Sequence, residues 1–297
     1  MTFCPVCGLK FHSGDYRMLA EHFIEQSRLS DFRHVSWLNR NISKNLMKAE
    51  DLMFSLMAFY HISGGIKKWI INDFVKRFRG DSPHPFILAM QQYDPEVIRG
   101  YVVEHHHFLK QWIRSCSYVI AKTELDDVQS YELENIMTEL HGYGASEPSH
   151  HELLIRMGES LGLERNFILA EKPLRQTAEA VKIWNELAAS GSWISTMAAM
   201  HSLELIANRD LSTHGAKYAY FNPSILSDSR VPAAVKAFLM EGYEADVSHS
   251  YVALDFVEKY AENEDIEEIQ YAYLRSAGAF SDYLEARLER GVMLGNK

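Results

Sequence analysis

The sequence is poor in the residues that interrupt helices and cross-link chains. It has 16 glycines and 8 prolines in 297 residues, so long segments are free to continue as helices. It has only three cysteines, an odd number that excludes a fully paired disulfide framework and favours a reducing compartment. Two of them, Cys4 and Cys7, are separated by two residues, a spacing typical of thiolates that bind one metal ion.

Long apolar runs and an excess of positive charge are also missing. No segment approaches the roughly 18 consecutive apolar residues of a membrane-spanning helix, and the first residues lack a signal-peptide pattern. The formal net charge of −10 argues against general nucleic-acid binding, because contacts to phosphates need a cationic surface. We therefore expect a cytoplasmic protein without a membrane or nucleic-acid partner.

Apolar residues recur with the period of an α-helix through most of the chain. Gly64 and Gly65 interrupt the first long pattern, and Ser149 is a suitable N-cap for a later helix. Helices are expected within 44–79 and over 94–121, 127–141, 173–190, 193–208, 231–261 and 264–289. The sequence therefore predicts an all-α protein, with a helical domain over residues 44–297 after a small N-terminal segment over residues 1–43.

The first residues contain four candidate zinc ligands. The stretch CPVCGLKFHSGDYRMLAEHF, with Cys4, Cys7 and His22, resembles the front of a Cys2His2 zinc finger. The pattern departs from such fingers after His22, because the next histidine is His34, with eleven residues between. A longer helix or a turn is needed to bring His34 round. We expect one zinc ion on these four residues, and reduced, unliganded cysteines are the alternative.

Several acids and imidazoles share a helix face farther along the chain. Such spacings suit solvated surface pairs, but unpaired carboxylates are costly inside a core. Helical bundles that direct Glu, Asp and His inward from several helices can bind two iron or manganese ions. The candidate pairs are Glu134 with His141, His201 with Glu204, and Asp246 with His249. Candidate pocket residues are Tyr101, His105, His107 and Tyr143.

Three segments of the chain resemble one known family of helical proteins. These are SPHPFILAMQQYDPEVIRGYVVEHHHFLKQW, ENIMTELHG and HHELLIRMGESLGL. They resemble the heme-oxygenase-like superfamily, in particular the branch of PqqC-like proteins and heme-oxygenase-like diiron oxidases. The resemblance covers roughly residues 80–290. It implies a helical bundle around non-haem iron, and bundles of this type often form homodimers.

The resemblance also implies a set of metal ligands. Diiron members have Glu-x6-His on one helix, Glu on a later helix, and then His-x3-Asp-x2-His. The matching residues here are Glu134, His141, Glu204, Asp246 and His249. The first position of the last motif falls on Gly242, which has no ligand atom. His201 is a possible replacement, Glu241 or Glu244 is another, and loss of the second metal ion or of both is the third.

The resemblance implies an oxidase or oxygenase that uses O2 and iron, with two ions in the complete site, on a small amino-acid-like or fatty-acid-like molecule. Two alternatives stay open. One is a cofactor-free or cysteine-based enzyme of the PqqC/TenA type, for which Cys116 is a candidate nucleophile. The other is a non-catalytic zinc-binding interaction protein.

Overall fold

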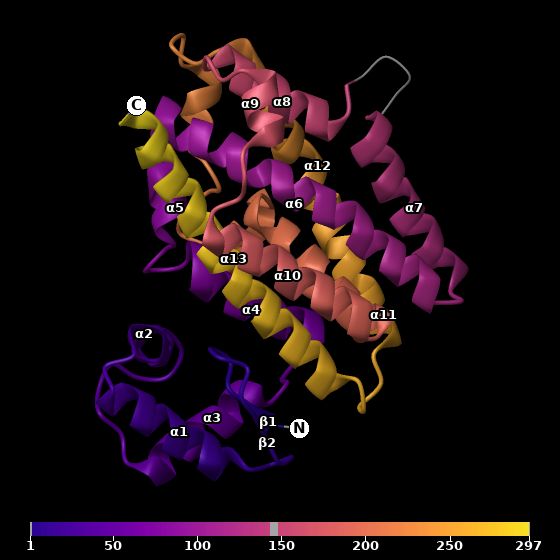
Figure 1. Ribbon diagram of the computed structural model, residues 1–297. Coiled ribbons are helices and arrows are strands. Elements are labelled where there is room, and N and C mark those ends of the chain that lie inside the picture. Colours follow the sequence, from indigo (N-terminus) through magenta and orange to yellow (C-terminus); the bar gives the residue numbers. More distant parts are fainter. Residues whose placement is uncertain (1, 143–147, 297) are drawn as a thin grey trace.

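The computed structural model describes residues 2–142 and 148–296, and the side chains of these residues except 242–249. Helices dominate both parts of the described chain (Figure 1). Its strands are β1 (Thr2–Phe3) and β2 (Lys10–Phe11), which pair antiparallel with Thr2 opposite Phe11. The all-α prediction is therefore confirmed.

The N-terminal unit is a small body at one end of the molecule (Figure 1). It contains the two strands, α1 (Tyr16–Arg28), α2 (Phe32–Asn41) and α3 (Ala49–Tyr60). Its core is aromatic: the Phe23 and Trp37 rings stack with centroids 5.1 Å apart, and Trp37 meets Phe59 of α3 edge-on. Since α3 packs against α1, it completes the small core of this unit.

The remaining elements form the helical bundle, in which the long helices lie side by side (Figure 1). They are α4 (Ile66–Phe74), a π-helical turn (Val75–Arg79), α5 (Pro85–Ala89), α6 (Pro95–Lys122), α7 (Asp126–His141), α8 (His150–Ser160), α9 (Arg165–Ala170), α10 (Arg175–Ser190), α11 (Trp193–His201), 3-10 segments (Ser202–Ile206, Arg209–His214, Pro223–Ser227), α12 (Ala233–Tyr260) and α13 (Ile266–Gly295).

Two glycines allow α6 and α13 to approach each other closely. A Cβ atom at Gly100 would collide with the carbonyl oxygen of Arg287, and one at Gly291 would lie 2.6 Å from the carbonyl oxygen of Glu96. Any larger residue at these positions would force the helices apart. The glycines therefore fix the position of α13 against α6, and with it the side chains that both helices direct inward.

Most of the predicted helices are present, with one difference that matters for function. Gly64 and Gly65 have φ of 82° and 96° and separate α3 from α4, and the Ser149 hydroxyl caps α8. The helix predicted over 193–208 ends at His201 and continues as a 3-10 segment. This tighter winding brings the Glu204 carboxylate back to the His201 ring. Among the described helices, none has the length and apolar character needed to span a bilayer.

The N-terminal unit contacts the bundle along α13. The Phe3 ring meets Tyr271 edge-on, and the Lys10 ammonium lies 4.4 Å from the centre of the same ring. Arg33 forms an ion pair of 2.9 Å with Asp282, farther along α13. The N-terminal unit is therefore packed against the bundle at several points along one helix.

Candidate functional site

The four predicted zinc ligands come together in the N-terminal unit. Their ligand atoms all lie within 4.8 Å of one another. The distance from Sγ to Nε2 is 3.4 Å for Cys4 and His34 and 3.5 Å for Cys7 and His22, and the two Nε2 atoms are 3.1 Å apart. A tetrahedral zinc ion places sulfur and nitrogen ligands about 3.5 Å apart and two nitrogens about 3.3 Å apart. The donor set therefore fits zinc.

A turn between α1 and α2 brings His34 to this cluster. Ser30 has a φ of 58°, so the chain reverses direction there, and Asp31 caps the new helix by accepting a bond from the His34 amide at 3.0 Å. The same carboxylate accepts a bond of 2.6 Å from His34 Nδ1. Because Nδ1 carries the proton, Nε2 keeps its lone pair for the metal.

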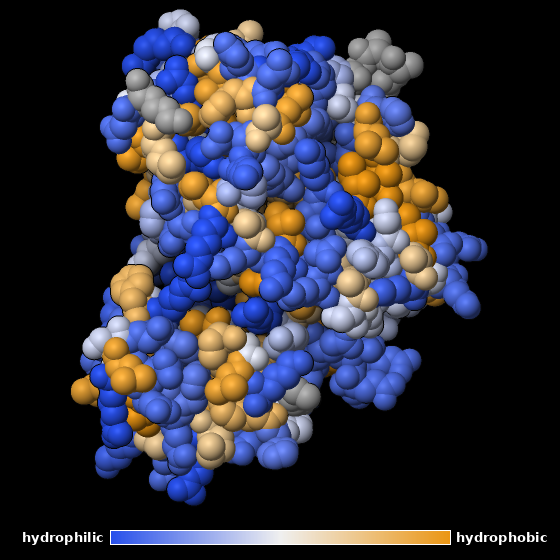
Figure 2. All heavy atoms as spheres, in the orientation of Figure 1, coloured by the Kyte–Doolittle hydropathy of each residue, from blue (hydrophilic) through white to orange (hydrophobic). Residues whose placement is uncertain are grey.

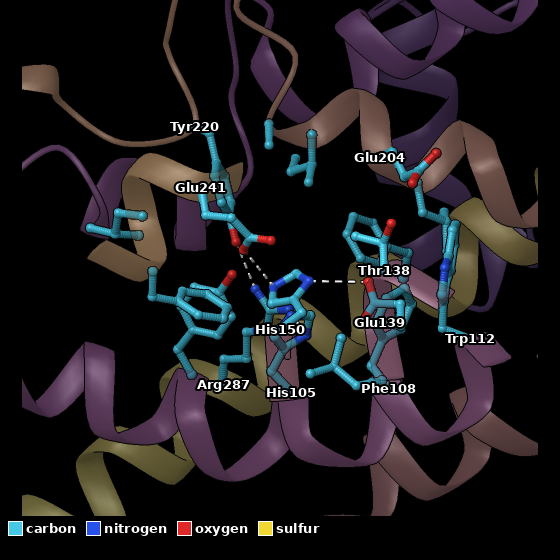
Figure 3. A pocket seen from close by; sticks show the side chains of 18 of the residues that line it. His105, Phe108, Trp112, Thr138, Glu139, His150, Glu204, Tyr220, Glu241 and Arg287 are labelled. Carbon is cyan, nitrogen blue, oxygen red and sulfur yellow. Dashed lines mark hydrogen bonds and ion pairs between the residues drawn. The ribbon is translucent and has the colours of Figure 1, made fainter. Parts of the chain in front are cut away.

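The bundle contains a separate cavity with aromatic walls and acidic groups (Figure 3). Helices α6, α7, α8, α12 and α13 and the 3-10 segment after α11 all contribute side chains to it. Its aromatic lining consists of Tyr101, Phe108, Trp112, Tyr220, Phe238 and Phe280. Its titratable lining consists of His105, Glu139, His150, Glu204, Glu241 and Arg287. A cavity of this composition can hold a small molecule and exchange protons with it.

His150 lies between two carboxylates on the cavity wall (Figure 3). Its Nδ1 atom is 3.1 Å from Oε1 of Glu139, and its Nε2 atom is 3.6 Å from Oε2 of Glu241. Ser149 caps α8 and so fixes where this helix begins, while Glu139 lies in the last turn of α7 and Glu241 on α12. An imidazole between two acids is suited to carry a proton to or from a bound molecule.

A second acid–imidazole group lies beside the cavity. His201 Nε2 is 2.8 Å from Oε1 of Glu132, and Nδ1 is 3.0 Å from Oε2 of the cavity residue Glu204. Burial disfavours a charged ring, but the two glutamates outweigh it and raise the pKa of His201 to about 10. Both nitrogens of the imidazolium then donate, so the ring has no lone pair for a metal ion.

Cys116 is the third member of this buried group. Its thiol lies within metal-ligand reach of Glu132 and His201, but it is 1% exposed. Burial, followed by the charge of Glu132, raises the pKa of the Cys116 thiol well above its usual range. A protonated thiol that does not line the cavity is a poor nucleophile.

The predicted pair Glu134 and His141 does not join the cavity. Both side chains are exposed on the outer face of α7, which also carries an apolar surface (Figure 2). The apolar residues there are Leu133, Met137 and Leu140. The acids that α7 directs inward are Glu132 and Glu139, each two positions earlier than the predicted pair. Two positions turn a helix by about 200°, which exchanges the inner face for the outer one.

Some of the other predicted site residues line the cavity and others do not. Glu204 lines the cavity, while the tentative ligand His201 is buried behind it with a carboxylate at each nitrogen. The side chains of Gly242, Asp246 and His249 lie outside the described residues. Of the expected pocket residues, Tyr101 and His105 line the cavity, His107 does not, and Tyr143 lies outside the described residues.

Sequence reasoning missed Glu139, His150 and Arg287 as cavity residues. Glu139 follows Glu132 by seven positions, which is the same spacing that drew attention to Glu134 and His141. His150 follows the capping residue Ser149, in a position where α8 can begin close to the end of α7. Local spacing gave a signal for the two acids of α7, but the hydrophobic pattern of that helix did not show which face is buried.

Comparison with known families and structures identifies two matching segments. The model of the TENA/THI-4/PQQC family matches residues 69–290, and the model of a C2H2-type zinc finger matches residues 1–61. The second match extends past the expected boundary at residue 43 and includes α3. No curated protein matched the chain.

Several solved structures share the fold of the bundle at low sequence identity. A domain of unknown function with a heme oxygenase-like fold from Shewanella denitrificans is 13% identical, with a TM-score of 0.56 over 84% of this chain and 96% of that one. A TenA homologue from P. horikoshii is 10% identical, with a TM-score of 0.57 over 75% and 95%. A CADD-like protein of unknown function from Nostoc punctiforme is 15% identical, with a TM-score of 0.52 over 80% and 97%.

Proposed function

Because this chain belongs to the TENA/THI-4/PQQC family, whose members are often enzymes, we propose that it is an enzyme that transforms a small molecule in the bundle cavity. The observation that carries the proposal is the position of His150 between Glu139 and Glu241 on the wall of an aromatic cavity. The reaction class that these groups support is a TenA-like hydrolysis with general acid–base catalysis.

The cavity residues would have different roles in such a reaction. Glu139 accepts a hydrogen bond from His150 Nδ1, which orients the ring. The other ring nitrogen, Nε2, faces Glu241 at 3.6 Å. His150 can then take a proton from an attacking water and return it to the leaving group, a role worth roughly 10²–10⁴ in rate.

The walls of the cavity favour a planar, nitrogen-containing substrate. Phe108, Trp112 and Phe280 supply flat apolar surfaces on which a ring can stack. Glu139 and Glu204 supply carboxylates that attract an amine or a protonated heterocycle. Aromatic walls also exclude bulk water, which strengthens each of these electrostatic contacts.

An iron-dependent oxidase is the second candidate function. One observation favours it: the carboxylates and imidazole of Glu139, His150, Glu204 and Glu241, from four elements, line a single cavity, and iron binds such donors. The described residues do not fit the expected diiron site, because Glu134 and His141 are exposed. Among those residues, the cavity acids and His150 also do not converge on one point as the zinc ligands do.

A substrate screen separates the two candidates. The purified protein is incubated with a defined library of amino-substituted pyrimidines, pyridines and thiazoles, and consumption is followed by mass spectrometry. Consumption that proceeds without O2, with a ferrous chelator present, and that falls at least 100-fold in His150→Gln supports acid–base hydrolysis. Consumption that requires O2 and added iron contradicts it and favours the oxidase.

We also propose that the N-terminal cluster binds one structural zinc ion. Cys4, Cys7, His22 and His34 would hold it as a closed tetrahedral set. The unit has a small core, so the ion would contribute much of its stability. The support is the match to a C2H2-type zinc finger together with the spacing of the four ligand atoms.

A further inference from the structure

Arg287 is a buried cation on the wall of the cavity. Its residue exposure is 2%, and it lies on α13 where Gly100 and Gly291 hold this helix against α6. Figure 3 shows it on the side of the cavity that holds Tyr220 and His105, away from Glu204 and Trp112. A buried charge is costly unless other groups compensate for its lost hydration. The groups around Arg287 therefore show whether the protein itself neutralises this charge.

The side chains around Arg287 supply hydrogen bonds and no negative charge. One terminal nitrogen donates to the Tyr220 hydroxyl at 3.0 Å, and the other donates to His105 Nδ1 at 3.0 Å and to the Tyr283 hydroxyl at 2.5 Å. The Tyr101 ring centre lies 4.0 Å from the guanidinium carbon. Within the part of the chain that the structure describes, Nε has no partner and no carboxylate forms an ion pair with this group.

His105 and Tyr283, which accept hydrogen bonds from Arg287, are neutral at pH 7. Burial, followed by the charge of Arg287, lowers the pKa of His105 well below its usual range. Burial raises the pKa of Tyr101 well above its usual range and also raises the pKa of Tyr283. The positive charge at this end of the cavity is therefore not neutralised by these side chains.

Arg290, one turn farther along α13, shows what a structural arginine in this bundle has. It is 4% exposed and forms two ion pairs of 2.7 Å, with Glu104 and with Glu171. Its third contact is a hydrogen bond of 2.6 Å to the Lys172 carbonyl oxygen. The fold thus supplies two carboxylates to the arginine that it uses for packing, and none of the described ones to the arginine on the cavity wall.

The opposite side of the cavity has the opposite charge. Glu204 lies on that side, with Glu139 between it and Arg287 (Figure 3). Glu241 lies on the same side as Arg287, beside Tyr220, and its carboxylate is 3.6 Å from the His150 ring (Figure 3). A ligand that spans the cavity therefore meets a guanidinium at one end, next to an acid that already faces an imidazole, and the Glu204 carboxylate at the other end. This arrangement matches a molecule that carries one negative and one positive group.

We propose that Arg287 binds the carboxylate of the substrate and that the substrate is a small amino carboxylic acid with a flat or apolar body. The inference rests on the proposed function, since it concerns the same cavity. The substrate carboxylate occupies the free donor directions of the guanidinium, and its amino group faces Glu139 and Glu204. Tyr220, Tyr283 and His105 hold the guanidinium in place and act as positioning residues.

Matched pairs of carboxylates and amides test this subsite without knowledge of the natural substrate. Glycine, L-phenylalanine and 4-aminobenzoate are compared with glycinamide, L-phenylalaninamide and 4-aminobenzamide at constant ionic strength, by calorimetry and thermal unfolding. We expect at least one acid to bind tenfold or more tightly than its amide and to raise the melting temperature by about 2–4 °C. Equal binding of every acid and its amide overturns the proposal.

Variants show which residue causes the preference for acids over amides. Arg287→Met should abolish the preference for acids over amides, and Arg287→Lys should retain part of it. Arg33→Met, which removes an ion pair between two residues that do not line the cavity, should leave it intact. A preference that persists in Arg287→Met overturns the proposal. If that variant does not fold, a crystal structure of the wild-type protein with the preferred acid decides: a carboxylate on the Arg287 guanidinium supports the proposal, and one bound elsewhere overturns it.

The outcome is separable from that of the proposed function. His150→Gln should stop turnover and leave the preference for acids over amides unchanged. Turnover that needs O2 and iron, combined with an intact preference, contradicts the hydrolysis alone. Turnover by acid–base chemistry in a protein that does not distinguish acids from amides contradicts the carboxylate subsite alone.

Discussion

The N-terminal unit and the bundle use histidine in opposite ways. In the N-terminal unit, the Nε2 atoms of His22 and His34 face each other and two cysteine sulfurs across one point. In the bundle, His150 and His201 each have a carboxylate near both ring nitrogens. Donors that converge on a point suit a metal ion, whereas a ring between two acids suits a proton. The two proposals thus place metal binding and proton transfer in different parts of the chain.

The largest effect that would test this contrast is loss of the zinc ion. Cys4→Ser should lower the zinc content by about one ion per chain and unfold the N-terminal unit, because structural zinc sites contribute roughly 10 kcal/mol or more. Elemental analysis and limited proteolysis measure both effects. Cys116→Ser is the matched control, since its sulfur lies in the bundle, and it should keep the zinc. Zinc retained in Cys4→Ser would contradict the assignment.

The next largest effect concerns catalysis. Glu139→Gln should lower kcat roughly 10²–10⁴-fold, because the imidazole of His150 loses the charge that orients it. Glu134→Gln is the control, as this residue lies on the exposed face of the same helix and should change kcat less than twofold. A measurement of kcat on any substrate found in the screen suffices. An equal loss of kcat in the two variants would contradict a specific catalytic role for Glu139.

Removal of a buried acid tests the contrast through stability. Glu132→Ala leaves the His201 ring without one of its two carboxylates inside the core and should cost about 3–5 kcal/mol in the free energy of unfolding. Glu134→Ala, at an exposed position, should change it by less than about 0.5 kcal/mol. Urea unfolding of both variants provides the values. Similar values for the two would mean that the buried ion pair contributes nothing.

The smallest effect is a dependence of stability on pH. The folded-state pKa of His201 is raised from 6.5 to about 10, so its protonated form is favoured in the folded state. The stabilisation is fully present below about pH 6.5 and is lost as the pH rises through about 10. The stability difference between wild type and His201→Gln should therefore shrink over that interval, as measured by chemical unfolding at several pH values. A constant difference would show that the ring is neutral.

Much of the fold follows from the sequence alone. Long amphipathic patterns with few glycines and prolines located the helices, and Gly64-Gly65 and Ser149 marked real boundaries. The sequence also indicated that Cys4, Cys7, His22 and His34 would come together, because two thiols near two imidazoles have few other uses in so short a segment. These features depend on local spacing or on a small number of residue types.

The cavity was harder to predict because it depends on distant contacts. The apolar residues Leu133, Met137 and Leu140 lie on the exposed face of α7, so the hydrophobic pattern of that helix does not mark its buried face. Arg287 and Arg290 differ by three positions and look alike in the sequence. Their environments differ because Glu104, far away in the chain, pairs with one of them and not with the other.

Helix α13 connects the two ends of the molecule. Tyr271 and Asp282 hold the N-terminal unit, whereas Phe280 and Arg287 line the cavity. A strong chelator that strips the zinc ion would release the N-terminal unit from this helix and disturb the cavity wall with it. Such a chelator would then inactivate the enzyme even if no metal ion contacts the substrate, so metal dependence has to be judged on zinc-replete protein.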